Sequence, residues 1–100
     1  MEKIELNHWY VKENELSISL MKFYVNIKIS KNDEFIYYQL SIIENSNTEL
    51  VFNFYTIEDA ISFTEQVVAN SFDINEVREK YILMFENNSF SNPYERKKKK

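Results

Sequence analysis

Two polar turns divide a long run of alternating apolar residues, and this pattern constrains the fold more than any other feature. Folding the chain about residues 31–34 sets four apolar pairs opposite each other: Ile29–Ile36, Ile27–Tyr38, Val25–Leu40 and Phe23–Ile42. Folding it about residues 45–47 sets three more: Ile42–Leu50, Leu40–Phe52 and Tyr38–Phe54. Because alternate side chains of a strand point to opposite faces, both hairpins predict the same buried face of an antiparallel meander.

The chain before these hairpins also alternates, but its phase changes once. Residues 3–11 alternate loosely, and residues 12–15 form a polar turn that sets Val11 opposite Leu16 and Trp9 opposite Ile18. The apolar positions are even-numbered up to Leu20 and odd-numbered from Phe23. A one-residue slip reverses every side chain, so we expect a bulge or a sharp bend near Met21-Lys22. This gives about four strands.

Two amphipathic helices follow the strands, each with its own start signal. Thr56 and Asp73 each precede an acidic residue three positions later, a pattern typical of helix N-caps. The first helix should bury one face and leave a wet, acidic side. The predicted buried face is Ile57, Ala60, Ile61, Thr64, Val67 and Val68, flanked by Phe63. The wet side is Glu58, Asp59, Ser62, Glu65 and Gln66.

The second helix should pack through residues at helical spacing and end before Pro93. Its predicted face is Ile74, Val77, Tyr81, Met84 and Phe85, with Phe72 stapled onto Val77. The run 81–85 is also compatible with a buried strand, but the cap at Asp73 favours helix. Asn87-Asn88 can end it, since Asn tolerates the left-handed conformation. The fold class is therefore α+β: an antiparallel β-meander followed by two C-terminal helices packed on one face.

Length and charge indicate one domain with a short basic tail. We expect a single α+β domain over residues 1–90 and a flexible basic tail over 91–100. Residues 95–100 hold five bases and one acid (+4), whereas residues 1–94 hold seven bases and fifteen acids (−8), which sums to the net −4. The sequence has no apolar run of membrane-spanning length and opens without a signal-peptide pattern, so we expect a cytoplasmic protein that does not enter a membrane.

The amino-acid composition excludes several classes of reactive and ligand-binding site. The chain has no Cys and no Gly, which excludes disulfides, thiolate metal sites and glycine-dependent phosphate or nucleophile motifs. Its single histidine, His8, lies in a strand-like stretch, and its paired acids lie where turns and helix starts recruit them. We therefore expect no catalytic residue, no metal and no cofactor. A small enzyme or ligand-binding domain stays as a third hypothesis.

Two surfaces are candidates for binding a partner. The face of the sheet away from the helices should be polar and aromatic, and the first helix should add acids beside it. The candidate residues are Tyr24, Lys28, Tyr37, Gln39, Asn53, Tyr55, Glu58, Asp59 and Glu65. Tyrosine is enriched at interface centres, and acids attract basic surfaces. The alternative is a single-stranded nucleic-acid-binding protein that stacks bases on the tyrosines.

In size, acidity and build the chain resembles the small proteins that phages and mobile elements encode to block host nucleases, including anti-CRISPR proteins. It is similar in build to toxin-immunity proteins as well. The resemblance lies in composition and covers no specific residue. It implies a non-enzymatic, protein-binding inhibitor of a basic host protein, such as a nuclease or CRISPR effector. The partner is expected to be a basic protein surface, and the chain itself a monomer or homodimer.

Overall fold

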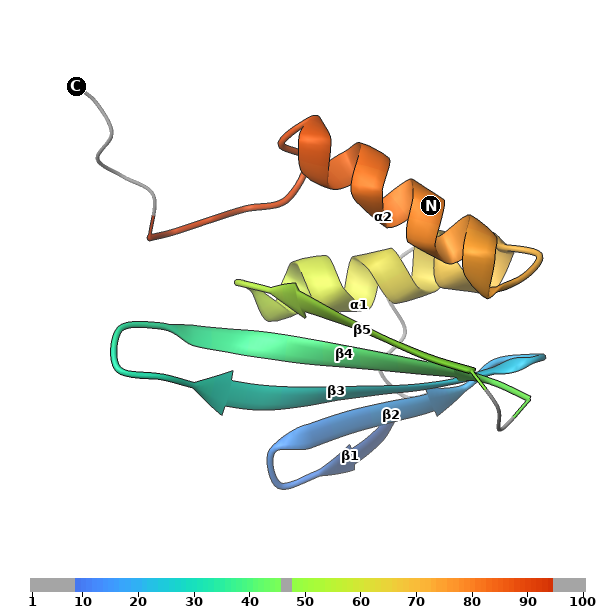
Figure 1. The fold of residues 1–100 in the computed structure, drawn as a ribbon. Coiled ribbons are helices and arrows are strands. Elements are labelled where there is room, and N and C mark those ends of the chain that lie inside the picture. The colour runs from blue at the N-terminus through green and yellow to red at the C-terminus, as the bar shows by residue number, and fades with distance from the viewer. Residues whose placement is uncertain (1–8, 46–47, 95–100) are drawn as a thin grey trace.

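The fold is a five-stranded antiparallel sheet with two helices on one face (Figure 1). The computed structural model describes residues 9–45 and 48–94. The strands are β1 (Tyr10–Lys12), β2 (Glu15–Ser19), β3 (Phe23–Lys31), β4 (Ile36–Glu44) and β5 (Thr48–Phe54), and they neighbour one another in chain order. The helices are α1 (Ile57–Gln66) and α2 (Ile74–Glu86), with a 3-10 turn, η2 (Val68–Asn70), between them. The predicted fold class is confirmed, with five strands in place of about four.

The extra strand comes from the phase change at Met21-Lys22. The chain does not bulge there but reverses, and the Leu20 N–H donates to the Phe23 carbonyl at 2.8 Å. β2 and β3 are therefore neighbours that pair Ile18 with Val25. A turn with two central residues joins even to odd positions, so it explains the phase change without an extra residue in either strand. Across β1 and β2, Val11 pairs with Leu16 as predicted, and Trp9 lies just before β1.

The β3–β4 register differs from the predicted one by two residues. Lys31 pairs with Ile36, and Ile27 pairs with Leu40 instead of Tyr38. The turn is shifted because the Asn32 side-chain oxygen accepts the amides of both Glu34 and Phe35 at 2.9 Å. A shift of two positions keeps every side chain on its predicted face. The β4–β5 register is as predicted, with Leu40 opposite Phe52.

The core lies between the inner face of the sheet and the helices. Val25, Leu40 and Ile42 are completely buried in the central strands. Phe63 of α1, expected at the flank of the helix, is also buried, between Phe52 and Phe54. The Tyr81 ring of α2 stacks on Phe52 with the ring centroids 4.0 Å apart. α1 therefore supplies most of the buried helical surface, and α2 closes the core above β5.

The helix boundaries follow the predicted signals. The Thr56 hydroxyl accepts the Asp59 amide at 3.2 Å, and the Asp73 carboxylate accepts the Glu76 amide at 3.0 Å. α2 is helical through residues 81–85 and ends at Asn87, after which Asn88 has a φ of 56°. The Ser89 amide donates to the Met84 carbonyl at 2.9 Å, which closes a Schellman-type end without glycine.

One detail of the second helix start was predicted wrongly. Phe72 is exposed and does not staple onto Val77; the Lys22 ammonium lies 4.7 Å from its ring centroid instead. The Phe72 amide donates to the Glu76 carboxylate at 2.7 Å. The pKa of Glu76 is lowered, chiefly by a hydrogen bond from Lys80 and next by the hydrogen bond from the Phe72 amide. The helix start is therefore held by polar contacts rather than by an apolar staple.

Long-range contacts tie both ends of the described chain to the domain. The Trp9 indole N–H donates to the Glu65 carboxylate at 2.8 Å, and the Ser91 amide donates to Asp59 at 2.7 Å. The Tyr94 hydroxyl bonds both the N–H and the carbonyl of Ile36. Contacts with the domain therefore extend to Tyr94, while His8 and residues 95–100 lie outside the described residues. Within the described part of the chain, no helix is long and apolar enough to span a bilayer.

Candidate protein-binding surface

The face of the sheet opposite the helices is open, and we call it the outer face (Figure 1). Its central row runs across four strands through Glu15, Lys28, Gln39 and Asn53. The Asn26 amide donates to both Glu15 and Ser17 at 3.1 Å, and Ser17 is only 7% exposed. Three polar side chains of this face, those of Glu15, Ser17 and Asn26, therefore bond to one another.

The tyrosines predicted for this face do not form one platform. Tyr24 pairs with Ile43 near one end of the sheet. Tyr37 lies six residues from Ile43 along β4, a separation of roughly 20 Å in a strand. The Tyr38–Phe54 pair, continued by one residue, sets Tyr37 opposite Tyr55 at the other end. A strand of stacked bases would therefore find no continuous row of tyrosines.

The opposite end of the sheet collects aromatic and acidic residues beside the β3–β4 turn. Phe35, Tyr55 and Tyr94 contact one another, with ring centroids 4.9–5.8 Å apart. Asp33 and Glu34 are exposed in the turn before Phe35, and Glu58 is exposed in the first turn of α1. We call this surface the hairpin end: Asp33, Glu34, Phe35, Tyr37, Tyr55, Glu58 and Tyr94.

The three acids predicted for the wet side of α1 have different roles. Glu58 is exposed, as expected. Asp59 and Glu65 are half-buried, because Asp59 holds the Ser91 amide and Glu65 holds the Trp9 indole. Glu65 is also seven residues from Glu58, about 10 Å along the helix. Of the three, only Glu58 is both exposed and without one of these structural bonds.

Acidic and basic residues are segregated along the chain. From Asn32 to Val77 the sequence holds nine acids and no Lys or Arg. The acids are Asp33, Glu34, Glu44, Glu49, Glu58, Asp59, Glu65, Asp73 and Glu76. This stretch forms β4, β5 and α1, whereas Lys12, Lys22, Lys28 and Lys31 belong to or flank the first three strands. This division is visible in a count of charged residues along the chain, but not in the difference in net charge between the tail and the body.

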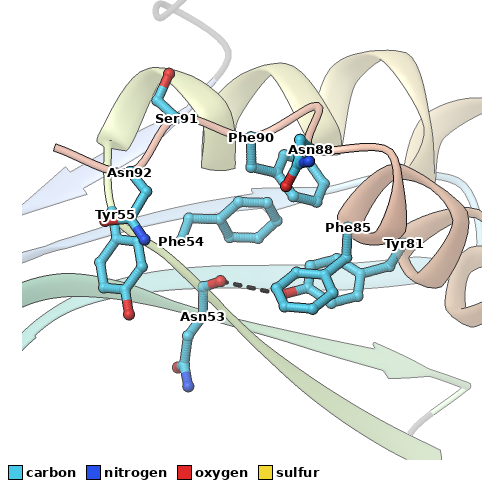
Figure 2. Close-up of a pocket in the computed structure, with 9 residues that line it drawn as sticks. All are labelled: Asn53, Phe54, Tyr55, Tyr81, Phe85, Asn88, Phe90, Ser91 and Asn92. Carbon is cyan, nitrogen blue, oxygen red and sulfur yellow. Dashed lines mark hydrogen bonds between the residues drawn. The ribbon is translucent and has the colours of Figure 1, made fainter. Parts of the chain in front are cut away.

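A pocket of about 180 Å³ opens where β5 ends beneath α2 (Figure 2). It is lined by Asn53, Phe54, Tyr55, Tyr81, Phe85, Asn88, Phe90, Ser91 and Asn92, and we call it the edge pocket. The Tyr81 hydroxyl points to the Asn53 carbonyl and donates to it at 3.2 Å. Burial, with a smaller contribution from Tyr55, raises the pKa of Tyr81 above its ordinary value.

The chemistry of the edge pocket suits binding of a neutral, apolar group. Its walls are aromatic rings, and its polar groups are amides and hydroxyls, which are uncharged near neutral pH. Phe85, one of its walls, is 63% exposed. Local sequence patterns give no signal for this site, because Phe90 lies beyond the helix pattern and contacts Phe54 only in the folded chain.

Among the described residues, no three His, Cys, Asp or Glu side chains cluster as metal ligands. Comparison of the chain with protein-family models, curated proteins and solved structures finds no match. The hairpin end, the outer face and the edge pocket are therefore the candidate binding sites.

Proposed function

We propose that this protein is a small, non-enzymatic binding module whose hairpin end docks on a basic protein surface. The observation that carries the proposal is the stretch from Asn32 to Val77, with nine acids and no base. Its exposed acid Glu34 precedes Phe35 in the chain, its exposed acid Glu58 follows Tyr55 by three residues, and the rings of Phe35 and Tyr55 contact each other. Acids of this kind raise the association rate by long-range attraction, and aromatic side chains supply contact area that slows dissociation.

The chemistry of the surface also suggests a class of partner. Proteins that bind nucleic acids carry basic surfaces for the phosphates. An acidic module that covers such a surface excludes the nucleic acid and so inhibits the protein. The proposed partner is therefore a nucleic-acid-processing protein, such as a nuclease or CRISPR effector, and the proposed effect is inhibition.

The test begins with capture of the partner from the native host and continues with its binding kinetics. In the variant Glu34→Lys/Glu58→Lys, association with the captured protein should slow by about tenfold at low salt, because the attractive charges are reversed. The difference should shrink at high ionic strength, since exposed charges are screened beyond about 10 Å at 0.1 M salt. Stopped-flow or surface-based kinetics at two salt concentrations measure both effects.

A matched variant separates the site from net charge. Glu13→Lys/Glu79→Lys also reverses two exposed acids, but these lie in the β1–β2 turn and on α2. Equal slowing by both variants would show that only total charge matters and would overturn the hairpin end as the site. Tight binding of a mixed-sequence single-stranded oligonucleotide, strengthened by the same reversals, would replace the proposal with the nucleic-acid alternative.

A further inference from the structure

β5 is an edge strand, and the backbone groups that point away from β4 line a free edge of the sheet. The Asn32 amide donates to the Phe35 carbonyl across the β3–β4 turn, so the next residue, Ile36, directs its N–H and carbonyl away from β3, where the Tyr94 hydroxyl bonds both. The backbone N–H and carbonyl groups of even-numbered residues of β4 therefore point toward β5. The register pairs the even-numbered residues of β4 with the even-numbered residues of β5. The backbone groups of Glu49, Val51 and Asn53 therefore point away from β4, toward the free edge of the sheet. Among the described residues, the Asn53 carbonyl alone of these groups has a partner, the Tyr81 hydroxyl.

The edge pocket continues this free edge at its C-terminal end. The stretch from Glu49 to Asn53 can pair with about 17 Å of an extended segment. Tyr81 occupies the Asn53 carbonyl and so marks where such pairing ends. The residue of the segment that follows the last paired one would lie opposite Phe54 and would project to the same face as Phe54, which lines the pocket. Edge and pocket are therefore placed to bind one segment together.

Size and chemistry identify the side chain that the pocket would take. A cavity of about 150 Å³ lined by apolar side chains can bind benzene. The edge pocket, at about 180 Å³ and with walls from Phe54, Tyr81, Phe85 and Phe90, is large enough for one phenyl ring. Edge-to-face and stacked contacts with these rings would add to the burial of the apolar surface.

Charge identifies the rest of the segment. Glu49 is exposed on the free edge, Glu86 is exposed beside Phe85, and Asp59 holds the Ser91 amide at the pocket. The pocket lining itself holds no charged residue. A segment with basic side chains flanking one aromatic residue would match this arrangement, whereas an acidic segment would be repelled.

We propose that an extended, basic segment of the partner adds to the sheet as a sixth strand along β5 and inserts a phenylalanine-sized side chain into the edge pocket. Strand addition of this kind draws affinity from main-chain hydrogen bonds and specificity from side-chain pockets. The inference rests on the proposed function, namely that the partner is a basic protein, and it names the part of the partner that binds.

The test uses a synthetic probe and does not require the natural partner. The probe is a seven-residue peptide with its phenylalanine next to one end, lysine on both sides of that phenylalanine, and threonine, valine and lysine in the remaining positions. Titrated into the isotope-labelled protein to about 1 mM, it should shift the amide resonances of Glu49, Val51 and Asn53 together with those of the pocket. Replacing its phenylalanine with alanine should weaken binding by about tenfold. Absence of these shifts, or equal affinity for the two peptides, would overturn the inference.

Two variants with matched controls locate the site. Val51→Pro removes a backbone N–H that points to the free edge at β5. Val11→Pro removes a backbone N–H that points to the free edge at β1, the opposite edge strand. Phe85→Ala removes an exposed pocket wall, and Leu83→Ala truncates an exposed residue of α2 outside the pocket. The first member of each pair should weaken peptide binding by about tenfold, and the second by less than about twofold.

The remaining outcomes separate this inference from the proposed function. If a captured basic partner binds Val51→Pro and Phe85→Ala as tightly as it binds the wild type, the binding module stands and the strand-addition site is wrong. If sedimentation shows that the protein dimerises and that Val51→Pro abolishes the dimer, the occupant of the edge is a second copy of the chain and the inference is overturned. If the peptide binds as predicted but no basic partner is captured, the site stands and the proposed partner is wrong.

Discussion

The two faces of the sheet use the same strands in opposite ways. The inner face buries Leu40 and Ile42 completely under the helices. The outer face has no covering layer in the described structure, yet Ser17 and Asn26 on it are bonded to neighbouring polar side chains (Figure 1). Stability therefore comes chiefly from the inner face, where apolar area leaves water. The outer face contributes little buried apolar area, so substitutions there should change binding more than folding.

The largest expected loss of stability comes from a substitution in the inner face. Leu40→Ala should lower the free energy of unfolding by about 2–5 kcal/mol, because it leaves a cavity at a fully buried site. Val51→Ala truncates an apolar side chain of the outer face that is 48% exposed, and should cost no more than about 0.5 kcal/mol. Urea titrations measure both. Comparable losses would mean that the outer face is also covered, for example by self-association.

A smaller loss of stability is expected at the free edge of β5, where the two faces of the sheet meet. Tyr81→Phe removes the hydroxyl that bonds the Asn53 carbonyl and should lower the free energy of unfolding by about 0.5–1.5 kcal/mol. Tyr24→Phe removes an exposed hydroxyl of the outer face and should cost no more than about 0.5 kcal/mol. Equal costs would show that the Tyr81 bond adds nothing to stability.

The same variant has a predicted pH signature. The pKa of Tyr81 is raised in the fold, so folding favours its neutral form. Its contribution is therefore complete below the ordinary pKa of 10.0 and is lost as pH rises through the higher folded pKa. Between about pH 8 and about pH 11 the wild type should lose more stability than Tyr81→Phe. A wild type that loses no more than the variant would contradict the assignment.

The smallest effect concerns the lysine tail. Deleting Lys97–Lys100 should leave the melting temperature unchanged, because four consecutive lysines have no apolar side chain to bury on either face. Tyr94→Ala is the contrasting change, since it removes contacts with Ile36, Phe35 and Tyr55 and should lower the melting temperature by several degrees. A tail deletion that lowers it as much would show that the lysines add to the stability of the domain.

Short-range patterns in the sequence were sufficient for much of the architecture. Alternation assigned Leu40, Val25 and Phe52 to the buried face because strand periodicity is a local property of the backbone. Thr56 and Asp73 marked both helix starts because a capping side chain bonds amides only two or three residues away. The absence of glycine likewise directed the turns to Asn, and Asn45 and Asn88 have positive φ.

Tertiary structure decided what depends on distant parts of the chain or on turn geometry. A polar run does not say which of its residues forms the turn, so the Asn32 side chain set the β3–β4 register two residues away from the prediction. The partners of Glu65 and Asp59 lie 56 and 32 residues away, so neither bond has a local signal. The edge pocket has no local signal either, because its residues come from β5, α2 and the chain beyond Asn88. Local periodicity determines which face a side chain occupies, whereas only packing between distant segments determines what it contacts there.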